Sequence, residues 1–378
     1  MSSVGGGPRT RPPFRADHVG SLLRPPRLRQ ARDDATAGSI SGERLREIED
    51  EEIRATVEMQ RAVGLQSATD GELRRGSWHM DFIYQLGGIE RTAGDIEVQF
   101  RNADGTVQFT PAAIAVKERV RLERTIFADD FLFLKRTVGD GATPKLTIPS
   151  PNMVHYRSGQ AALNPDVYPE IGPFWDDLAA AYRAQIAGLA ALGCEYLQLD
   201  DTSLAYLNDP KHRDSMASRG EDVAHLHETY VANINAALRD RPAGLTVTTH
   251  LCRGNFRSSW VAEGGYEYVA EALFGGLEVD GFFLEFDDER SGGFEPLRFV
   301  APGKLVVLGL VTSKRGDLES RDQLMRRIEQ ASRQIPIEQM CLSPQCGFSS
   351  TVDGNALSAD QQAAKLELIV RTAAEVWG

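Results

Sequence analysis

The stretch GLTVTTHLC, residues 244–252, is a short apolar and β-branched run that ends on His250 and Cys252. A run of this kind, preceded by glycine and followed by polar side chains, is typical of a buried strand. Similar runs recur along the chain with amphipathic helical patterns between them, which predicts βα units and a parallel sheet. The predicted strands are Ala16–Ser21, Leu65–Glu72, Lys145–Pro151, Tyr196–Asp201, Leu245–His250, Val279–Phe286, Leu305–Ser313 and Gln339–Ser343.

Four helices are predicted from apolar residues at helical spacing. The first runs from Ser41 to Val63, and the last begins at Ser358, where Gln361 completes a capping box. A second helix precedes Gly193, a typical cap residue. The apolar faces that define these helices are Leu45, Ile48, Ile53 and Val57; Trp175, Leu178, Tyr182, Ile186 and Leu189; Val223, Leu226, Tyr230, Ile234 and Leu238; and Leu366, Ile369, Val370 and Ala373.

Eight strands alternating with helices predict an α/β fold, and a (β/α)8 TIM barrel fits this pattern better than an open sheet. The stretch 91–140 interrupts this alternation of strands and helices. It contains the segments IEVQF (96–100) and TVQFT (106–110), in which apolar and polar residues alternate. We therefore expect an insertion after the second strand that contains a hairpin. Residues 1–13 are predicted to be a flexible tail, and residues 14–378 a single catalytic barrel.

The charge, the apolar content and the cysteines of the chain disfavour several classes of protein. The chain has 378 residues, 42% of them hydrophobic, and a net charge of -12, which disfavours a nucleic-acid partner because phosphates require a basic face. We find no uninterrupted apolar stretch of the roughly 18 residues that a membrane span requires, and the N-terminus lacks the apolar core of a signal peptide. Four cysteines without such a signal indicate free thiols in a reducing compartment. We expect a cytoplasmic enzyme, monomeric or homodimeric.

Polar side chains follow nearly every predicted strand. The carboxyl ends of barrel strands are where active sites lie, so this convergence favours an enzyme. The residues concerned are Asp17, His18, Ser21, Asp70, Glu72, Asn152, Asp200, Asp201, His250, Cys252, Glu285, Lys314 and Cys346.

Four of these residues have the side chains that zinc prefers: His250, Cys252, Glu285 and Cys346. Each alone would more often be a buried structural residue, but together they end successive predicted strands. Two thiolates and a carboxylate make a zinc site electron-rich, which suits hydrolysis poorly and suits binding of a substrate thiol well. The residues therefore predict a Zn²⁺ site for S-alkylation of a thiol.

Several motifs resemble the catalytic C-terminal barrel of cobalamin-independent methionine synthase, and more closely its short single-barrel bacterial relatives. These motifs are DHVGS (17–21), DGE (70–72), LQLDD (197–201), HLC (250–252), LE (284–285) and SPQCG (343–347). The resemblance covers the chain from Phe14 onward. It implies that His250, Cys252, Glu285 and Cys346 bind zinc and that Ser21, Glu72 and Asp200 bind homocysteine. It also implies methyl transfer from methylfolate to homocysteine, the reaction of 5-methyltetrahydropteroyltriglutamate–homocysteine S-methyltransferase.

The sequence departs from that family in three ways. The extra N-terminal barrel of the full-length enzyme has no counterpart here. In LGLVTSKRG (308–316), Lys314 stands where the general-acid histidine is expected, so we assign it as the candidate catalytic acid and leave methylfolate, methylcobalamin and onium donors open. An aromatic platform for a pterin is also not evident, the candidates being His155, Tyr156 and Trp78.

Other functions are compatible with parts of the pattern. The runner-up is zinc-dependent alkyl transfer to another thiol, such as coenzyme M, from an epoxide or another electrophile. A metal-free barrel resembling uroporphyrinogen decarboxylase and a non-catalytic zinc-binding protein are further alternatives, against which the ligand set and the carboxylates argue. The acidic segment FDDERSGG (286–293) lacks calcium-loop spacing and is predicted to be a solvated loop.

Overall fold

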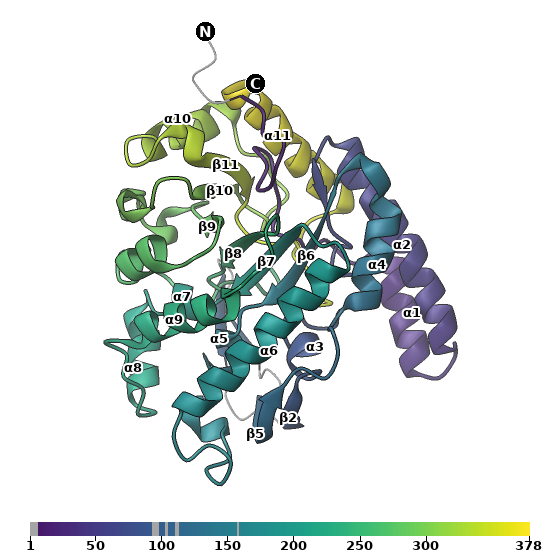
Figure 1. Ribbon diagram of the computed structural model, residues 1–378. Coiled ribbons are helices and arrows are strands. Elements are labelled where there is room, and N and C mark those ends of the chain that lie inside the picture. The colour runs from purple at the N-terminus through teal and green to yellow at the C-terminus, as the bar shows by residue number, and fades with distance from the viewer. Residues whose placement is uncertain (1–6, 93–97, 103–104, 110–112, 157–158) are drawn as a thin grey trace.

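The computed structural model describes residues 7–92, 98–102, 105–109, 113–156 and 159–378 (Figure 1). Within them, seven parallel strands form one curled sheet whose order follows the chain, β1-β6-β7-β8-β9-β10-β11. The strands are β1 (Ser67–Ala68), β6 (Thr143–Pro149), β7 (Tyr196–Asp201), β8 (Thr246–Leu251), β9 (Gly281–Glu285), β10 (Leu305–Val311) and β11 (Met340–Pro344). Sequential parallel strands require crossover connections, and helices supply most of them. The fold is an α/β half-barrel of the TIM-barrel type.

The central strands are buried along their whole length. Every residue of β7, β9, β10 and β11 is buried, because one face of the sheet packs into the centre of the ring and the other lies under the helices. This explains why the strands read as continuous apolar runs in the sequence. Polar side chains within the strands, such as Lys145, Gln198 and Thr248, are buried as well.

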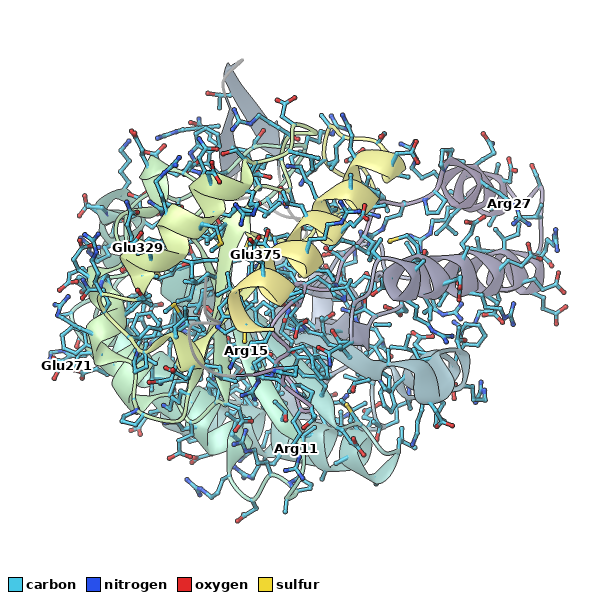
Figure 2. All side chains as sticks on the ribbon, turned by 90° about the horizontal axis from the view of Figure 1, so that it is seen from above. Arg11, Arg15, Arg27, Glu271, Glu329 and Glu375 are labelled. Carbon is cyan, nitrogen blue, oxygen red and sulfur yellow. The ribbon has the colours of Figure 1, made fainter. Side chains whose placement is uncertain are left out.

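Eleven α-helices are present among the described residues, together with short 3-10 and π turns. The helices are α1 (Pro26–Thr36), α2 (Gly42–Ala62), α3 (Met80–Ile83), α4 (Ala128–Val138), α5 (Asn152–Tyr156), α6 (Gly172–Ala191), α7 (Ser203–Tyr206), α8 (Pro210–Ala217), α9 (Leu226–Leu238), α10 (Arg321–Ala331) and α11 (Ala359–Trp377). The short turns are Gly139–Gly141, Gly159–Ala162, Glu271–Gly276, Glu289–Ser291, Glu295–Phe299 and Ile337–Gln339. Seen from above, α1 and α2 project to one side of the ring, with Arg27 on α1, while α11 crosses beside Arg15 (Figure 2).

The four predicted helices are present with small shifts at their ends. Ser41 caps α2 by accepting the Arg44 N–H, and Ser358 and Gln361 form the predicted capping box of α11. The third helix starts at Leu226, so Val223 lies outside it. These ends were predictable because they depend on local capping chemistry.

The first predicted strand, Ala16–Ser21, is not a regular strand. Only Ala16 pairs, by a single parallel bridge to Leu342, and Gly20 has a φ of 134°, which breaks the extended conformation. On the other side, the Leu22 N–H donates to the Gly71 carbonyl over 3.1 Å. This segment therefore lies in the gap between the edge strands β11 and β1 without joining the sheet.

The second predicted strand, Leu65–Glu72, is reduced to two residues. After β1 the backbone turns sharply, with φ values of 67° at Gly71 and 58° at Glu72. Asp70 stabilises this turn by accepting the Glu72 N–H over 2.8 Å. A non-glycine residue in the left-handed region is strained, and such strain is common at functional sites.

The stretch predicted as an insertion contains two small antiparallel sheets. One pairs β2 (Gly87–Thr92) with β5 (Ala113–Arg121), and the other pairs β3 (Val98–Asn102) with β4 (Gly105–Phe109). In Figure 1, β2 and β5 lie at the end of the molecule away from both termini. Helix α4 packs on α2 and β6 as a crossover helix, whereas the small sheets interrupt the alternation, and the bounds 91–140 of the insertion stay a prediction. Residues 93–97, 103–104 and 110–112 of this range lie outside the described residues.

The beginning of the chain is partly described. Residues 1–6 of the predicted tail lie outside the described residues. Beyond them, the Arg9 side chain donates to the Pro13 carbonyl over 2.7 Å, and Gln66 donates to the Arg9 carbonyl over 3.1 Å. Residues 9–13 therefore contact the body of the fold near β1. Among the described residues, no helix is long and apolar enough to cross a membrane.

Candidate metal centre

The strand ends bring the four predicted zinc ligands together. His250 lies near the end of β8, Glu285 is the last residue of β9, and Cys346 follows β11 by two residues. The register between strands sets their common level, because His250 pairs with Phe283 and β9 continues in register with β10. One ligand atom from each of His250, Cys252, Glu285 and Cys346 lies within 4.8 Å of the others, and all four residues are buried.

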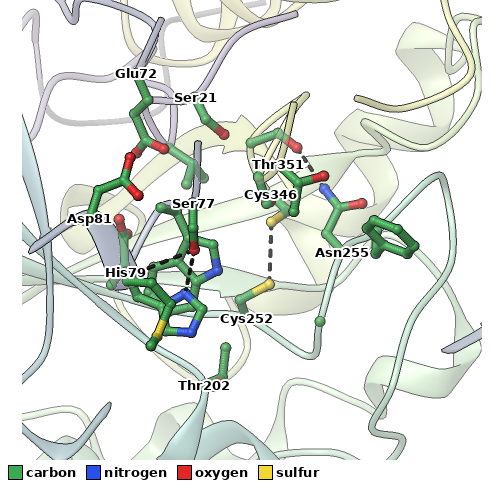
Figure 3. A pocket seen from close by; sticks show the side chains of 18 of the residues that line it. Ser21, Glu72, Ser77, His79, Asp81, Thr202, Cys252, Asn255, Cys346 and Thr351 are labelled. Carbon is green, nitrogen blue, oxygen red and sulfur yellow. Dashed lines mark hydrogen bonds between the residues drawn. The ribbon is translucent and has the colours of Figure 1, made fainter. Parts of the chain in front are cut away.

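The two cysteines form the core of this cluster. The Sγ atoms of Cys252 and Cys346 are 3.3 Å apart, and both cysteines are free thiols (Figure 3). Two sulfurs bound to one zinc at about 2.3 Å with tetrahedral geometry would lie about 3.8 Å apart. The pair therefore needs to open by only about half an ångström. Hydrogen bonding from Cys252 lowers the pKa of the Cys346 thiol well below its usual value, so one member of the pair favours the thiolate that a metal binds.

His250 is a candidate ligand whose ring nitrogens are poorly satisfied by the protein. Among the described residues, neither ring nitrogen has a hydrogen-bond partner of ordinary geometry, although the ring is fully enclosed. Burial lowers the pKa of His250, but the neighbouring Cys346 and Asp200 bring it above its ordinary value. Leaving a buried polar atom unpaired costs free energy, and a metal ion in the centre of the cluster would satisfy one of the two nitrogens.

Glu285 is oriented by its neighbours. Its Oε1 accepts the backbone N–H of Arg253 over 2.9 Å, and its Oε2 lies 3.4 Å from Arg290. Its own N–H donates to the Tyr266 hydroxyl over 2.9 Å. A carboxylate has about four acceptor positions, so it can bind a metal in addition to these partners. One nitrogen, two sulfurs and one oxygen fit a zinc site.

A cavity of 440 Å³ opens beside the cluster (Figure 3). Figure 3 shows Ser21 and Glu72 on one side of the sulfur pair and Asn255 on the other. The predicted site residues that line the cavity are Ser21, Glu72, Asp200, His250, Cys252 and Cys346. The structure thus gathers the predicted metal ligands and the predicted substrate-binding residues at one place, with Glu285 behind the lining.

The two predicted substrate carboxylates face this cavity. Glu72 Oε1 accepts the Thr147 hydroxyl over 2.7 Å, whereas Glu72 Oε2 is buried and lacks a hydrogen-bond partner among the described residues. Asp200 accepts the Gln198 amide over 2.7 Å. Burial and the nearby Glu72 charge raise the pKa of Asp200 to about 7, against the opposing effect of His250. An ammonium group placed between these carboxylates would satisfy the unpaired oxygen and compensate both charges.

Ser21 is fixed by the chain that carries Cys346. The Ser21 carbonyl accepts the Phe348 N–H over 2.9 Å, and the Ser21 hydroxyl packs directly on Gly347. Asn255, which the sequence analysis missed, donates to the Gly347 carbonyl over 2.7 Å, and its own Oδ1 is buried without a hydrogen-bond partner among the described residues. No motif in the sequence marked Asn255, because its role depends on contact with a segment 92 residues away.

Lys314, the predicted catalytic acid, does not line the cavity. Its side chain is buried, and Nζ lies 3.7 Å from the Asp287 carboxylate. Burial raises the pKa of Asp287, but Lys314 and Arg290 outweigh this and hold it below its ordinary value. The segment 286–293, predicted as a solvated loop, places Asp287 and Arg290 inside the protein with side chains 3% and 8% exposed. The prediction holds for Asp288 and Glu289, which are exposed, but it is wrong for Asp287 and Arg290, which are shielded from solvent and form ion pairs.

Aromatic side chains form the outer wall of the cavity. They are Trp78, Tyr84, Phe100, Tyr206 and Phe256. Of the predicted platform residues, Trp78 is among them, whereas His155 and Tyr156 are buried elsewhere. The backbone of Arg101 in β3 exchanges two hydrogen bonds with Trp260, of 2.7 and 2.8 Å, which attaches the small sheet to the segment after β8.

The fold and the site together define a class of proteins: α/β half-barrels with a thiolate-rich ligand cluster and paired carboxylates at the carboxyl ends of the strands. Residues 14–374 match the model of the cobalamin-independent synthase catalytic domain, and the chain belongs to this family.

Three relatives show the range of similarity. The chain is 47% identical over 371 residues to the uncharacterized protein YxjG of Bacillus subtilis, covering 98% of this chain and 96% of that protein. A crystal structure from Listeria monocytogenes, provisionally described as a vitamin-B12-independent methionine synthase, is 38% identical with a TM-score of 0.78, over 98% of this chain and 100% of that one. A methionine synthase of Saccharolobus solfataricus is 24% identical over 330 residues, covering 87% of this chain and 86% of that protein. Membership of this family supports a methyltransferase.

Proposed function

We propose that the protein is a zinc-dependent S-methyltransferase that converts homocysteine to methionine. The observation that carries this proposal is the convergence of His250, Cys252, Glu285 and Cys346 within 4.8 Å beside a cavity that two carboxylates also face. A structural zinc site would need no adjacent cavity with an unpaired carboxylate oxygen. We also propose that the fold is an eight-membered barrel in which residues 15–21 take the position of the first strand.

Different residues of the chain would bind the zinc, which activates the substrate thiol, and the amino-acid part of the substrate. His250, Cys252, Glu285 and Cys346 would hold the zinc, which lowers the pKa of a bound thiol and keeps its sulfur nucleophilic. Glu72 and Asp200 bind the ammonium group of the amino acid, and this fixes the position of its side-chain sulfur. Ser21 and the backbone around Gly347 lie where they can receive the carboxylate. The side chains of Ser21, Glu72 and Asp200 are buried, which strengthens each of these polar contacts.

The candidate site matches homocysteine better than it matches a thiol without an amino group. Coenzyme M is the acceptor of the runner-up reaction, and it has no ammonium group to satisfy the unpaired Oε2 of Glu72. Although the Arg75 guanidinium lies 3.5 Å from Glu72 Oε1, a ligand without a cation would leave Oε2 buried and unpaired, which opposes the binding of such a ligand. Homocysteine provides the cation, so we prefer it as the acceptor.

Methylfolate is the donor that family membership favours, and we propose it as the default. Its methyl group leaves from a nitrogen that must be protonated, and Lys314 would deliver that proton only by leaving Asp287. A methylcobalamin or onium donor requires less protonation. The deciding experiment offers the zinc-loaded protein homocysteine with each donor in parallel, and coenzyme M with an epoxide in a further arm. Turnover only in that last arm would refute the proposed function.

A further inference from the structure

The proposed reaction needs a proton donor that faces the cavity. The nitrogen of an amine-type methyl donor leaves poorly unless it is protonated, so an acid must reach it while the methyl group is transferred. Lys314 does not line the cavity, and its Nζ lies 3.7 Å from the Asp287 carboxylate. The acid is therefore to be sought among the titratable side chains of the cavity wall.

Most of these side chains have another role or an unsuitable acidity. Glu72 and Asp200 would hold the substrate ammonium group in the proposed function. Asp201 accepts two serine hydroxyls and a backbone N–H, and Asp353 pairs with an arginine over 2.9 Å. Near pH 7, carboxylic acids are ordinarily ionised already, and phenols and guanidinium groups ordinarily hold their protons too tightly. An imidazolium has the required acidity, and among the described residues of the wall the imidazole outside the ligand cluster is that of His79.

The His79 ring is held by the turn that carries it (Figure 3). Its Nδ1 lies 3.2 Å from the Ser77 hydroxyl oxygen, and the centre of its ring lies 4.4 Å from the centre of the Trp78 ring. The Ser77 oxygen also accepts the Met80 N–H over 3.3 Å. A hydroxyl can donate to the Nδ1 of a neutral imidazole and accept from the Nδ1 of an imidazolium. The bond to Ser77 can therefore persist when a proton leaves Nε2.

The backbone ties His79 to the groups that would bind the amino acid. His79 follows Glu72 by a few positions, and both side chains line the same cavity. Between them, Ser77 forms an antiparallel bridge with Thr351, on the segment that follows Cys346. This bridge joins the turn that carries His79 to the chain that carries a candidate ligand. The backbone thus holds the imidazole beside the place where the thiol would bind.

Resting on the proposed function, we propose that His79 is the general acid that protonates the leaving nitrogen of methylfolate, with Ser77 as its positioning residue. The imidazolium gives its Nε2 proton to the donor nitrogen, and the homocysteine thiolate forms a bond to the methyl carbon. The carbon–nitrogen bond breaks and leaves its electron pair on the nitrogen. The products are methionine, a secondary amine and a neutral imidazole. The proton that the imidazole then regains from solvent replaces the one that the thiol released.

The test offers zinc-loaded His79→Gln two methyl donors in separate assays. Methylfolate requires a protonated nitrogen, whereas iodomethane releases iodide, which requires no proton. Methionine formation from methylfolate should fall by about 100-fold or more, the ordinary contribution of a general acid. Methionine formation from iodomethane should match that of the native protein. The Kd for homocysteine, measured by calorimetry, should also be native, because neither process needs an acid.

Three further variants test the assignment. Ser77→Ala should show the same difference between donors at a smaller size, roughly tenfold with methylfolate, because the ring loses one orienting hydrogen bond. In His79→Gly, added imidazole should restore part of the methylfolate turnover, since it can enter the vacated space. His212→Gln is the matched control: the His212 ring centre lies 4.8 Å from that of Tyr206, but His212 does not line the cavity. It should behave as the native protein does with both donors.

Each contrary result has a separate meaning. Native methylfolate turnover in folded His79→Gln would overturn the inference and leave the proposed function standing. An equal loss with both donors would show that His79 supports the structure of the site, and would also overturn it. If the native enzyme uses methylcobalamin but not methylfolate, no acid is required, and the inference is wrong while transfer to homocysteine stands. If it makes no methionine from any donor, the proposed function fails and the inference fails with it.

Discussion

The hydroxyl oxygen of Ser21 lies over the α-carbon of Gly347, where an added Cβ would come within 1.9 Å of it. The two residues come from opposite ends of the chain, yet they form one wall of the same cavity. Residue 347 must therefore lack a side chain for Ser21 to occupy its position, and the SPQCG motif ends on glycine for a steric reason.

Gly347→Ala should displace Ser21 and raise the KM for homocysteine while zinc stays bound. The overpacking should cost about 1–3 kcal/mol of stability. Chemical denaturation and steady-state kinetics would measure the two effects. Gly172→Ala is the control, because a Cβ at Gly172 meets no atom within 4 Å. A Gly347→Ala enzyme with native KM and stability would contradict the assigned contact.

Cys252→Ser and Cys346→Ser should each remove most of the bound zinc and all methyl transfer. Both sulfurs belong to the four-atom cluster, and a serine hydroxyl does not form a thiolate at neutral pH. The fold should persist, because the sheet is buried independently of the cluster. Metal analysis and circular dichroism would check both points, with the buried Cys194→Ser as a variant outside the cluster. Full zinc retention in both single variants would refute the ligand set.

Glu72→Gln and Asp200→Asn should weaken homocysteine binding by about 1.5–3 kcal/mol each, the value of a charge-assisted hydrogen bond. The amides preserve shape but remove the charge that compensates the ammonium group. Binding should be measured on the zinc-loaded protein with homocysteine and with 3-mercaptopropionate, which lacks the amino group. The effect should appear only with homocysteine. If both thiols lose the same amount of binding free energy, the carboxylates do not recognise the amino group.

Lys314→Met should lower stability by about 1.5–3 kcal/mol, because Asp287 loses one of its two cationic partners. Turnover with the preferred donor, expressed per folded molecule, should stay within a few-fold of native, since Lys314 does not line the cavity. Stability and kinetics on the same preparation separate these effects. If methylfolate turnover collapses in a variant that is folded and loaded with zinc, Lys314 is the acid after all.

Acid should destabilise the protein in part through His155. Burial lowers the pKa of His155 to about 4, whereas the unfolded chain titrates near its ordinary value of about 6.5. The unfolded state therefore binds the proton first, so stability is complete above about pH 6.5 and is lost as the pH falls toward 4. The loss should reach about 3 kcal/mol for this residue. In His155→Phe, the unfolding free energy should fall less steeply over this range, and an unchanged slope would exclude the assignment.

The convergence of four ligand-type side chains could be predicted from sequence, because each of them lies at or just after the end of an apolar run. Parallel strands in register then bring His250, Glu285 and Cys346 to one level without any information beyond the strand ends. The carboxylates at Glu72 and Asp200 followed from family motifs, and the structure places both at the cavity.

The sequence could not show the unusual backbone conformations or the burial of charged residues in a loop. The left-handed conformations at Gly20 and Glu72 break two predicted strands, and they are imposed by tertiary packing rather than by local propensity. Arg290 and Asp287 sit in a segment whose composition is typical of a solvent-exposed loop, but their charges pair internally. Composition reports how polar a segment is, and it does not report where the partners of its charges lie.

The segment that bridges Leu342 and Gly71 has a consequence for the order in which the molecule matures during translation. Ser21 leaves the ribosome long before Cys346, and β11, the partner strand of Ala16, is synthesised after the other strands of the sheet. Domains that emerge vectorially can form local structure first, but this centre has no complete precursor. A nascent chain that has not yet extended past Cys346 has Cys252 without the second sulfur of the cluster. The segment that carries Ser21 then also lacks its contacts with the chain around Cys346. If the centre binds a metal, it can do so with all four ligands only after the segment that carries Cys346 has been synthesised.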